Sequence, residues 1–169
     1  MPIVPVTVRS TPLTNAYFEM FIDNELVAAI SSIGAIKSSV AANASKSGTQ
    51  LHSVFSPGAV TYEAVEIKQA QILDVALPNW FETVHSPVSA GRIQIDDMKK
   101  DVLINVKDSA MQTRIQHELY SCLPTSISWD ALDSNAEANT FLSFTLQYEY
   151  NLTRYLDCLL YTSPSPRDA

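Results

Sequence analysis

The stretch TFLSFTLQYEY, residues 140–150, decides the fold class because its apolar and polar side chains alternate. A period of two is that of a β-strand with one buried face and one exposed face. Alternation over so long a stretch is typical of an antiparallel strand that covers a core on one side. The residues expected on the apolar face are Leu142, Phe144, Leu146, Tyr148 and Tyr150.

Other stretches rich in aromatic and β-branched residues predict further strands. They are residues 16–23, 25–33, 60–69, 101–108 and the short extended piece 126–129. Residues 114–122 fit either a strand or a helix, and Pro124 is expected to end that element in both cases.

Two dipeptides predict turns between these strands. Asp23-Asn24 is expected to close a hairpin, since both residues tolerate left-handed backbone. Pro57-Gly58 is a turn signal before the strand at 60–69.

One helix is predicted, over ILDVALPNWFETVH at residues 72–85. Asp74 is its expected N-cap, and Pro78 falls near the first turn, where a missing N–H costs least. The apolar residues at helical spacing are Leu77, Trp80, Phe81 and Val84. Many strands and one helix predict a mainly β domain, a small antiparallel β-barrel or sandwich with one flanking α-helix. The expected core markers are Trp80, Trp129, Phe144, Leu146 and Tyr148.

Residues 34–56 are predicted to form a long extended loop, rich in Ala and Ser. A loop of this length in a compact domain is usually either functional or disordered, and composition leaves both possibilities open. Its scattered apolar residues are Ile36, Val40, Leu51, Val54 and Phe55.

The 169-residue chain has 46% hydrophobic and 17% charged residues and a formal net charge of −7. These values predict a single folded domain over residues 1–157, with residues 1–14 as an irregular, proline-containing N-terminal arm. The low charged fraction is consistent with apolar surface kept for partners. The acidic balance argues against a protein that grips nucleic-acid phosphates. Neither a transmembrane segment nor a signal peptide is expected.

Residues 158–168, CLLYTSPSPRD, match the translation of a transposon-type sequencing adapter. We therefore interpret residues 158–169 as a translated adapter that is not native, and leave them out of the fold prediction. Cys122 is then the one native cysteine, and the chain has no pair for a disulfide.

No combination of residues predicts a catalytic, cofactor-binding or metal site. His52, His85 and His117 are isolated from one another, without the spacing of a zinc site. Asp96-Asp97 falls in a predicted loop and supplies too few ligands for a cation. The sequence has neither a nucleophile elbow nor a phosphate-binding glycine loop. We therefore expect a protein that is not an enzyme.

Four stretches, in order, resemble the tail tube proteins of contractile-tailed phages. The first is residues 15–36, with Asn24 where the family often has Gly. The second is residues 57–84, where Gln69-Ala70 replaces the family's Arg-Gly. The third is 101–108 and the fourth is 118–150. The matching residues of the second and fourth stretches are Pro57, Gly58, Tyr62, Ile67, Leu77, Trp80, Pro124, Trp129, Leu132, Asp133, Asn139 and Glu149.

This resemblance implies a structural subunit that forms hexameric rings stacked into a tube, whose lumen conducts DNA during ejection without specific binding. It also implies partners in the tail sheath, the baseplate and the tail terminator, no cofactor, no membrane, and a place in the virion after assembly in the host cytoplasm. Residues 34–56 would reach the neighbouring ring, with the apolar residues named above as contacts.

Three alternatives stay open on the sequence. The same fold serves as the inner tube of contractile injection or secretion systems that carry protein effectors. A small-ligand β-barrel would need a wide, empty interior, which the large side chains of 140–150 argue against. An unrecognised enzyme has no predicted site.

Overall fold

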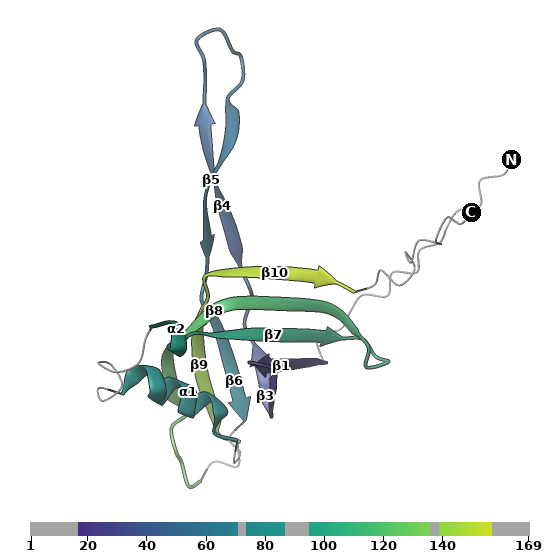
Figure 1. The fold of residues 1–169 in the computed structure, drawn as a ribbon, viewed down its shortest axis with the longest axis vertical. Helices are drawn as coiled ribbons and strands as arrows, with labels where there is room; N and C mark the ends of the chain where they lie inside the picture. Colours follow the sequence, from purple (N-terminus) through teal and green to yellow (C-terminus); the bar gives the residue numbers. More distant parts are fainter. Residues whose placement is uncertain (1–16, 71–73, 87–94, 136–138, 157–169) are drawn as a thin grey trace, which may run out of the picture.

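The computed structural model describes residues 17–70, 74–86, 95–135 and 139–156, and the protein is mainly β (Figure 1). The predicted N-terminal arm 1–14 and the tail 158–169, which we interpret as a translated adapter, lie outside the described residues. The elements are β1 Phe18–Ile22, β2 Glu25–Val27, β3 Ile30–Ile33, β4 Ser38–Ser45, β5 Val54–Tyr62, β6 Val65–Ala70, α1 Ala76–His85, α2 Ile95–Met98, β7 Lys100–Lys107, β8 Thr113–Trp129, β9 Phe141–Gln147 and β10 Tyr150–Tyr155.

Eight strands form one curled antiparallel sheet in the order β2-β1-β7-β8-β9-β6-β3, with β10 also paired to β8. The long strand β8 belongs to two layers. Its residues 113–122 pair with β7 and β10, and its residues 123–129 pair with β9. We call β2-β1-β7-β8-β10 the first layer and β8-β9-β6-β3 the second layer. The predicted β-sandwich with a flanking helix is confirmed, and the described strands do not close into a barrel.

The first predicted turn is confirmed. Asp23 and Asn24 have φ values of 48° and 69°, the left-handed backbone that a two-residue hairpin requires, and they join β1 to β2. The single strand predicted over 25–33 is wrong, because Ala29 has a φ of 57° and divides it into β2 and β3. The chain thereby passes from the first layer to the second.

Two side-chain hydrogen bonds hold this corner between the layers. The Gln69 side chain donates a hydrogen bond to the Ala28 carbonyl at 2.9 Å, and the Ala28 N–H donates to Asp74 Oδ2 at 3.0 Å. Gln69 is only 2% exposed, so its amide needs this partner. Asp74 thus ties the start of the helix to the β2–β3 corner.

Helix α1 begins later than predicted. Val75 holds the N-cap position without a side-chain cap, while Asp74 Oδ1 accepts a hydrogen bond from the Ala76 N–H at 3.1 Å. Asp74, the predicted N-cap, therefore stands one residue before the observed cap position, and residues 72–73 of the predicted helix lie outside the described residues. Pro78 is in the first turn, as expected.

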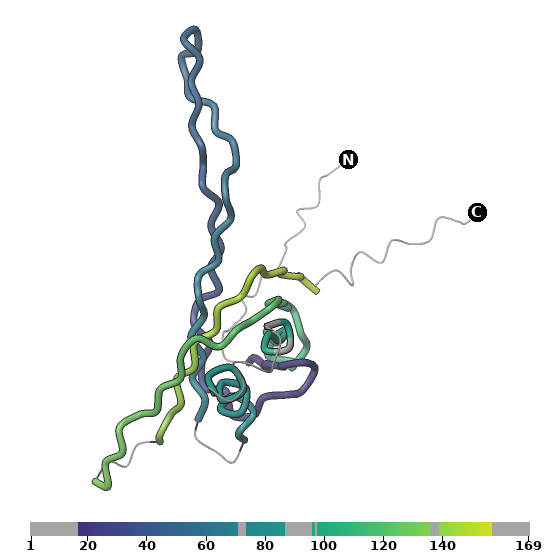
Figure 2. Tube along the Cα trace, turned by 60° about the vertical axis from the view of Figure 1, so that its left-hand side comes forward, coloured from purple at the N-terminus to yellow at the C-terminus, as the bar shows by residue number. Residues whose placement is uncertain are grey.

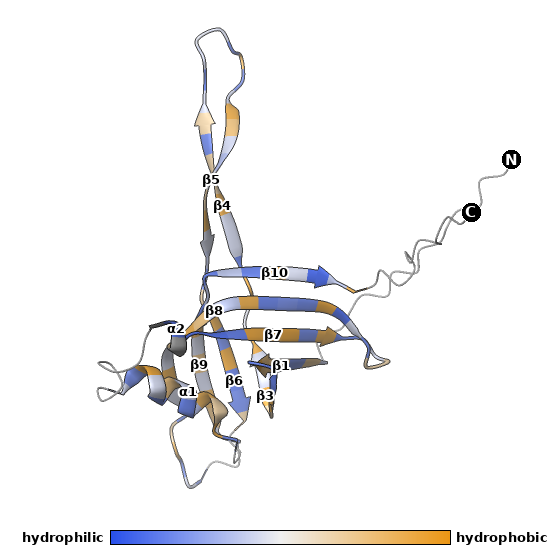
Figure 3. Ribbon diagram, viewed as in Figure 1, coloured by the Kyte–Doolittle hydropathy of each residue, from blue (hydrophilic) through white to orange (hydrophobic). Residues whose placement is uncertain are grey.

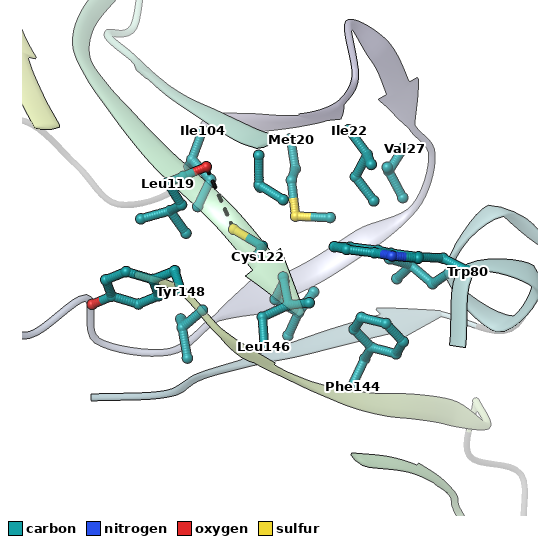
Figure 4. Close-up of a cluster of buried hydrophobic side chains, with 14 of the residues drawn as sticks. Met20, Ile22, Val27, Trp80, Ile104, Leu119, Cys122, Phe144, Leu146 and Tyr148 are labelled. Carbon is teal, nitrogen blue, oxygen red and sulfur yellow. Dashed lines mark hydrogen bonds between the residues drawn. The ribbon is translucent and has the colours of Figure 1, made fainter. Parts of the chain in front are cut away.

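The core lies between the two layers and under α1 (Figure 4). Its largest side chains form an aromatic group. The ring centroids of Trp80 and Phe144 are 6.0 Å apart, and the ring of Phe81 contacts that of Phe144 edge to face. The Trp80 indole N–H donates to the Met98 carbonyl at 2.8 Å, which satisfies its one polar atom. The helix therefore covers the sandwich as the sequence predicted.

Several strand boundaries correct the sequence analysis. Pro124 does not end its element, because β8 continues through it with a register shift between Pro124 and Ser126. Prolines are tolerated at such ladder irregularities. The stretch 60–69 is not one strand, since β5 ends at Tyr62 and β6 begins at Val65. Asp96-Asp97 lies in the short helix α2 instead of a loop.

Two predicted core positions are wrong. Strand β9 ends at Gln147, so the alternation stops there and Tyr150 begins β10 on the outer face, 48% exposed and stacked on Tyr120 at 4.5 Å. Trp129, at the end of β8, is 52% exposed. The other predicted core residues, Leu142, Phe144, Leu146, Tyr148 and Trp80, are buried.

Candidate assembly surfaces

Residues 34–56 do not form the predicted loop. Strands β4 and β5 make a separate two-stranded antiparallel sheet that extends away from the rest of the protein (Figures 1 and 2). We call this element, residues 38–62, the hairpin. Its chain reversal lies between residues 45 and 54, where the Gln50 N–H donates to the Ser47 carbonyl at 2.9 Å.

The predicted turn at Pro57-Gly58 is wrong, because both residues lie inside β5. The register shifts beside them, so that Val40 pairs with Val60 while Ala42 pairs with Pro57. A Cβ on Gly58 would lie 3.0 Å from the Ala41 carbonyl oxygen, so a larger residue would push the two strands apart here. The Pro-Gly pair marks a β-bulge in the hairpin.

One face of the hairpin is apolar. Residues that are directly opposite in a sheet share a face, and residues two apart along a strand do so as well. The register therefore places apolar side chains on one side, where the described chain leaves Val40 55%, Phe55 68% and Val60 50% exposed. Figure 3 marks hydrophobic residues along the hairpin strands in orange. This hairpin apolar face consists of Val40, Ala42, Ala44, Phe55, Pro57 and Val60.

The opposite face of the hairpin is polar apart from Ala41 and Val54. It carries Ser39, Asn43, Ser45, Ser56 and Thr61. The hairpin is thus an amphipathic sheet, and such an element is stable in water only when another surface covers its apolar side.

The base of the hairpin is fixed to the core. The ring centroids of Tyr62 and Tyr148 are 5.7 Å apart, and the Tyr148 hydroxyl donates a hydrogen bond to the Lys37 carbonyl at 3.0 Å. The Glu63 N–H donates to the same carbonyl at 3.1 Å. Because Tyr62 and Ser38 are paired on the same side as Val40 and Val60, the hairpin apolar face continues outward from the core.

The five residues predicted as subunit contacts lie in different environments. Ile36 packs against the core, Leu51 lies in the reversal and is 89% exposed, and Val54 lies on the polar face. Val40 and Phe55 belong to the hairpin apolar face. Sequence reasoning did not predict Val60 as a contact residue. The apolar residues at every second position, Val40, Ala42 and Ala44, were a signal for the strand β4, with which Val60 pairs.

Two long strand edges are also without a partner among the described residues. Strand β10 pairs only with β8, and residues 123–129 of β8 pair only with β9. Unpaired edges of this length are templates for another strand. Both edges belong to the long antiparallel ribbon formed by β8 with β9 and β10.

The outer face of the first layer carries charged residues that are paired with one another. Lys107 contacts Glu19 at 2.5 Å, and Arg154 contacts Glu118 at 3.1 Å. Gln116 donates to the Asn105 side chain at 3.1 Å between them. Because these basic side chains have acidic partners, the pairs leave this surface without a large net charge of either sign.

The described residues contain no group of three or more metal-ligating side chains. His52 is exposed and His85 stacks on Phe81 at 5.3 Å in the last turn of α1. His117 is half-buried, and burial lowers its pKa.

Cys122 is expected to be inert toward thiol reagents in the folded protein. Its side chain is fully buried, and burial raises the pKa of the thiol to about 12. At pH 8 almost no reactive thiolate is therefore present. In a Cys158→Ser variant, alkylation followed by mass spectrometry should show no labelling of Cys122 until denaturant unfolds the protein. Rapid labelling under native conditions would contradict the burial.

The fold and these surfaces define a mainly β protein whose described residues leave an apolar hairpin face and two strand edges uncovered. Over residues 14–151 the chain matches the family described as the T4-like virus tail tube protein gp19. The chain belongs to this family and is a tail tube protein. No curated protein sequence matches it.

Solved structures share the fold at low sequence identity. In the sheath-tube complex of an extracellular contractile injection system called PVC, a chain aligns with a TM-score of 0.72 at 14% identity, covering 88% of this chain and 95% of that one. A chain of the anti-feeding prophage tube-terminating cap aligns with a TM-score of 0.70 at 16% identity, covering 90% and 99%. A chain of the SPP1 tail tube aligns with a TM-score of 0.57 at 12% identity, covering 85% of this chain and 80% of that one. None of the described helices is long and apolar enough to cross a membrane.

Proposed function

We propose that this tail tube protein assembles into hexameric rings that stack into a tube, and that the lumen conducts DNA during ejection. The observation that carries the proposal is the hairpin apolar face, which the described part of its own chain leaves uncovered. A second copy in the stack is the partner that would cover it at every position along a tube. Burial of this surface would supply the free energy for stacking.

Within a ring, the free edges of β10 and of residues 123–129 would pair with strands of neighbouring copies. Edge pairing removes the exposed ladder of each copy and gives a continuous sheet. The outer face of the first layer would then line the lumen. Because its bases are already paired with acids, it would hold phosphates weakly and let DNA pass.

The proposed partners are the sheath, the baseplate and the tail terminator of a virion assembled in the host cytoplasm. A second candidate function is the inner tube of a contractile injection system that carries protein effectors. It is favoured by the alignment with the PVC and anti-feeding prophage chains, which comes with higher TM-scores than the alignment with the SPP1 tube.

Negative-stain electron microscopy of the purified protein tests the proposal. We expect rings, or tubes of uniform width, with a central hole and sixfold symmetry in end views. A protein that stays monomeric at high concentration would contradict assembly. Particles purified from the natural source separate the two functions, since a tube filled with DNA supports the phage role and one filled with protein supports the injection system.

A further inference from the structure

The end of the protein opposite the hairpin also carries uncovered apolar side chains. The hairpin extends toward one end of the longest axis, and the end of β8 with the residues up to 135 lies at the other end in both views (Figures 1 and 2). In this region Trp129 is 52% exposed and Leu132 is 86% exposed. We call these two residues the apolar tip.

The apolar tip continues the core side of the second layer beyond the part that is covered. Trp129 is paired with Leu142, and Ile127 is paired with Phe144, so all four side chains share one side of the ribbon. Exposure on this side rises toward the end of β8, since Phe144 is fully buried, Ile127 is partly buried and Trp129 is half exposed. The described part of the chain therefore ends its core before Trp129 and leaves that indole without a cover.

Hydrogen bonds hold the apolar tip in place. The Asp130 N–H donates to the Phe141 carbonyl at 3.1 Å, and the Phe141 N–H donates back to Asp130 Oδ2 at 3.0 Å. Beyond Leu132, the Asn135 N–H donates to Asp133 Oδ1 at 2.9 Å. Because the backbone on both sides of Leu132 is held, less conformational entropy is lost when another molecule binds there.

The outer end of the hairpin carries the only formal charge of that element at pH 7. Lys46 directly follows β4 and is the single charged residue in the hairpin. Phe55 is paired with Ala44, two residues before Lys46, so an exposed aromatic ring and a base lie at the same end. Strand β5 has nine residues and spans about 30 Å, which carries this end well beyond the body of the protein.

The two ends of the protein are complementary in charge. The described residues beside the apolar tip, 129–135, contain the acids Asp130 and Asp133 and no base. The Asp130 carboxylate is used inside the ribbon, whereas Asp133 lies in the exposed link after β8. An aromatic and basic hairpin end therefore matches an apolar and acidic tip, which is the pattern expected of two surfaces that bind each other.

We infer that the apolar tip of one copy binds the hairpin of a copy in the next ring. Phe55 packs against Trp129 and Leu132, and Lys46 lies beside Asp133. The inference rests on the stacking given under the proposed function, and it adds the surface to which the hairpin binds. Because the two surfaces differ, the contact is heterologous, and each added ring presents the same pair of surfaces to the next one.

Two variants test this contact. Trp129→Ser with Leu132→Ser, the tip variant, removes the apolar tip, and Phe55→Ser with Val60→Ser, the hairpin variant, removes its partner. Each variant alone should raise the protein concentration needed for tube growth at least about tenfold and leave single rings, because every junction loses apolar contacts. Sedimentation velocity and negative-stain microscopy measure the number of rings in each particle.

A mixture of the two variants, made after their rings have formed, separates this contact from any other. The tip variant keeps an intact hairpin and the hairpin variant keeps an intact tip, so one junction can form between a ring of each kind. Both outer ends of that pair are defective, and growth should stop at stacks of two rings. Such stacks support the inference, and a mixture that contains only single rings would overturn it.

Other outcomes distinguish the inference from the proposed function. Normal tubes from the tip variant would overturn the inference alone, and loss of its rings would place the tip within the ring and overturn it as well. Failure of the unmodified protein to form tubes would overturn the proposed function and the inference with it. The matched control is Met111→Ser in the turn between β7 and β8, since Met111 is 55% exposed and should not affect tube length.

Charge reversal supplies a second test that leaves the apolar residues intact. Lys46→Glu should raise the concentration needed for tube growth by about threefold, because an attraction at each junction becomes a repulsion. Adding Asp133→Lys to the same chain should restore growth, since the pair is re-formed with its signs exchanged. Growth that is unaffected by Lys46→Glu, or that is not restored by the second change, would overturn the assigned contact.

Discussion

Replacement of residues 40–60 by a short Gly/Ser linker is expected to abolish tube growth while the body of the protein keeps its fold. The linker leaves Ser38 and Tyr62 in place, so the contacts of Tyr62 with Tyr148 and of Tyr148 with the Lys37 carbonyl remain. The removed residues have no part in the buried core. The expected readouts are an unchanged circular dichroism melt and the absence of tubes in the microscope.

Two further variants keep the length of the hairpin and change only its side chains. Phe55→Ser with Val60→Ser removes two members of the hairpin apolar face, each of which would contribute about 1.5–3 kcal/mol if fully buried against a neighbour. Val54→Ser is the matched control, because Val54 has a similar exposure but lies on the polar face. We expect tubes from the control and short or no tubes from the double variant.

Tubes of normal length from the linker variant would contradict the proposed role of the hairpin in stacking. A linker variant whose body does not fold would show instead that the hairpin supports the sandwich. Equal loss of tubes in the Val54 control and in the double variant would show that the two faces are not distinguished at the contact.

Phe144→Ala is expected to lower the free energy of unfolding by about 3–5 kcal/mol. Phe144 is fully buried at the centre of the aromatic group formed with Trp80 and Phe81, so truncation leaves a cavity bounded by rigid rings and a helix. Urea denaturation, followed by circular dichroism on the unassembled protein, measures this loss.

Thr145→Ala is the control in the same strand. Thr145 follows Phe144 on the opposite side of β9 and is partly exposed, so its truncation should change stability by no more than about 0.5 kcal/mol. Similar losses in the two variants would contradict the alternation of β9 between a core side and a solvent side.

The local pattern of residues determined much of this fold. Strict alternation in 140–147 fixed β9 and its buried side, since a period of two leaves only one side for Leu142, Phe144 and Leu146. Asp23-Asn24 determined the β1–β2 turn, because few residue pairs accept left-handed backbone twice in succession. The apolar spacing around Trp80 determined which side of α1 faces the core.

Other features followed from pairing with distant strands. Whether 114–122 was a strand or a helix was decided by β7 and β10, which pair along its two edges, and pairing with β9 carries β8 on through Pro124. Tyr150 continued the alternation in the sequence, yet it is exposed because β10 belongs to the first layer, where its side of the strand faces outward.

In the candidate assembly surfaces, too, some features follow from the local sequence and others from strand pairing. The small and apolar residues of 38–62 were visible in the sequence, but Pro57-Gly58 signalled a turn that proved to be a bulge. A dipeptide encodes a backbone preference, whereas the register of two strands depends on all the pairs between them. Residue order therefore determined the strands and their periodicity, and only the tertiary pairing decided which apolar side chains meet in the core and which remain exposed for another molecule.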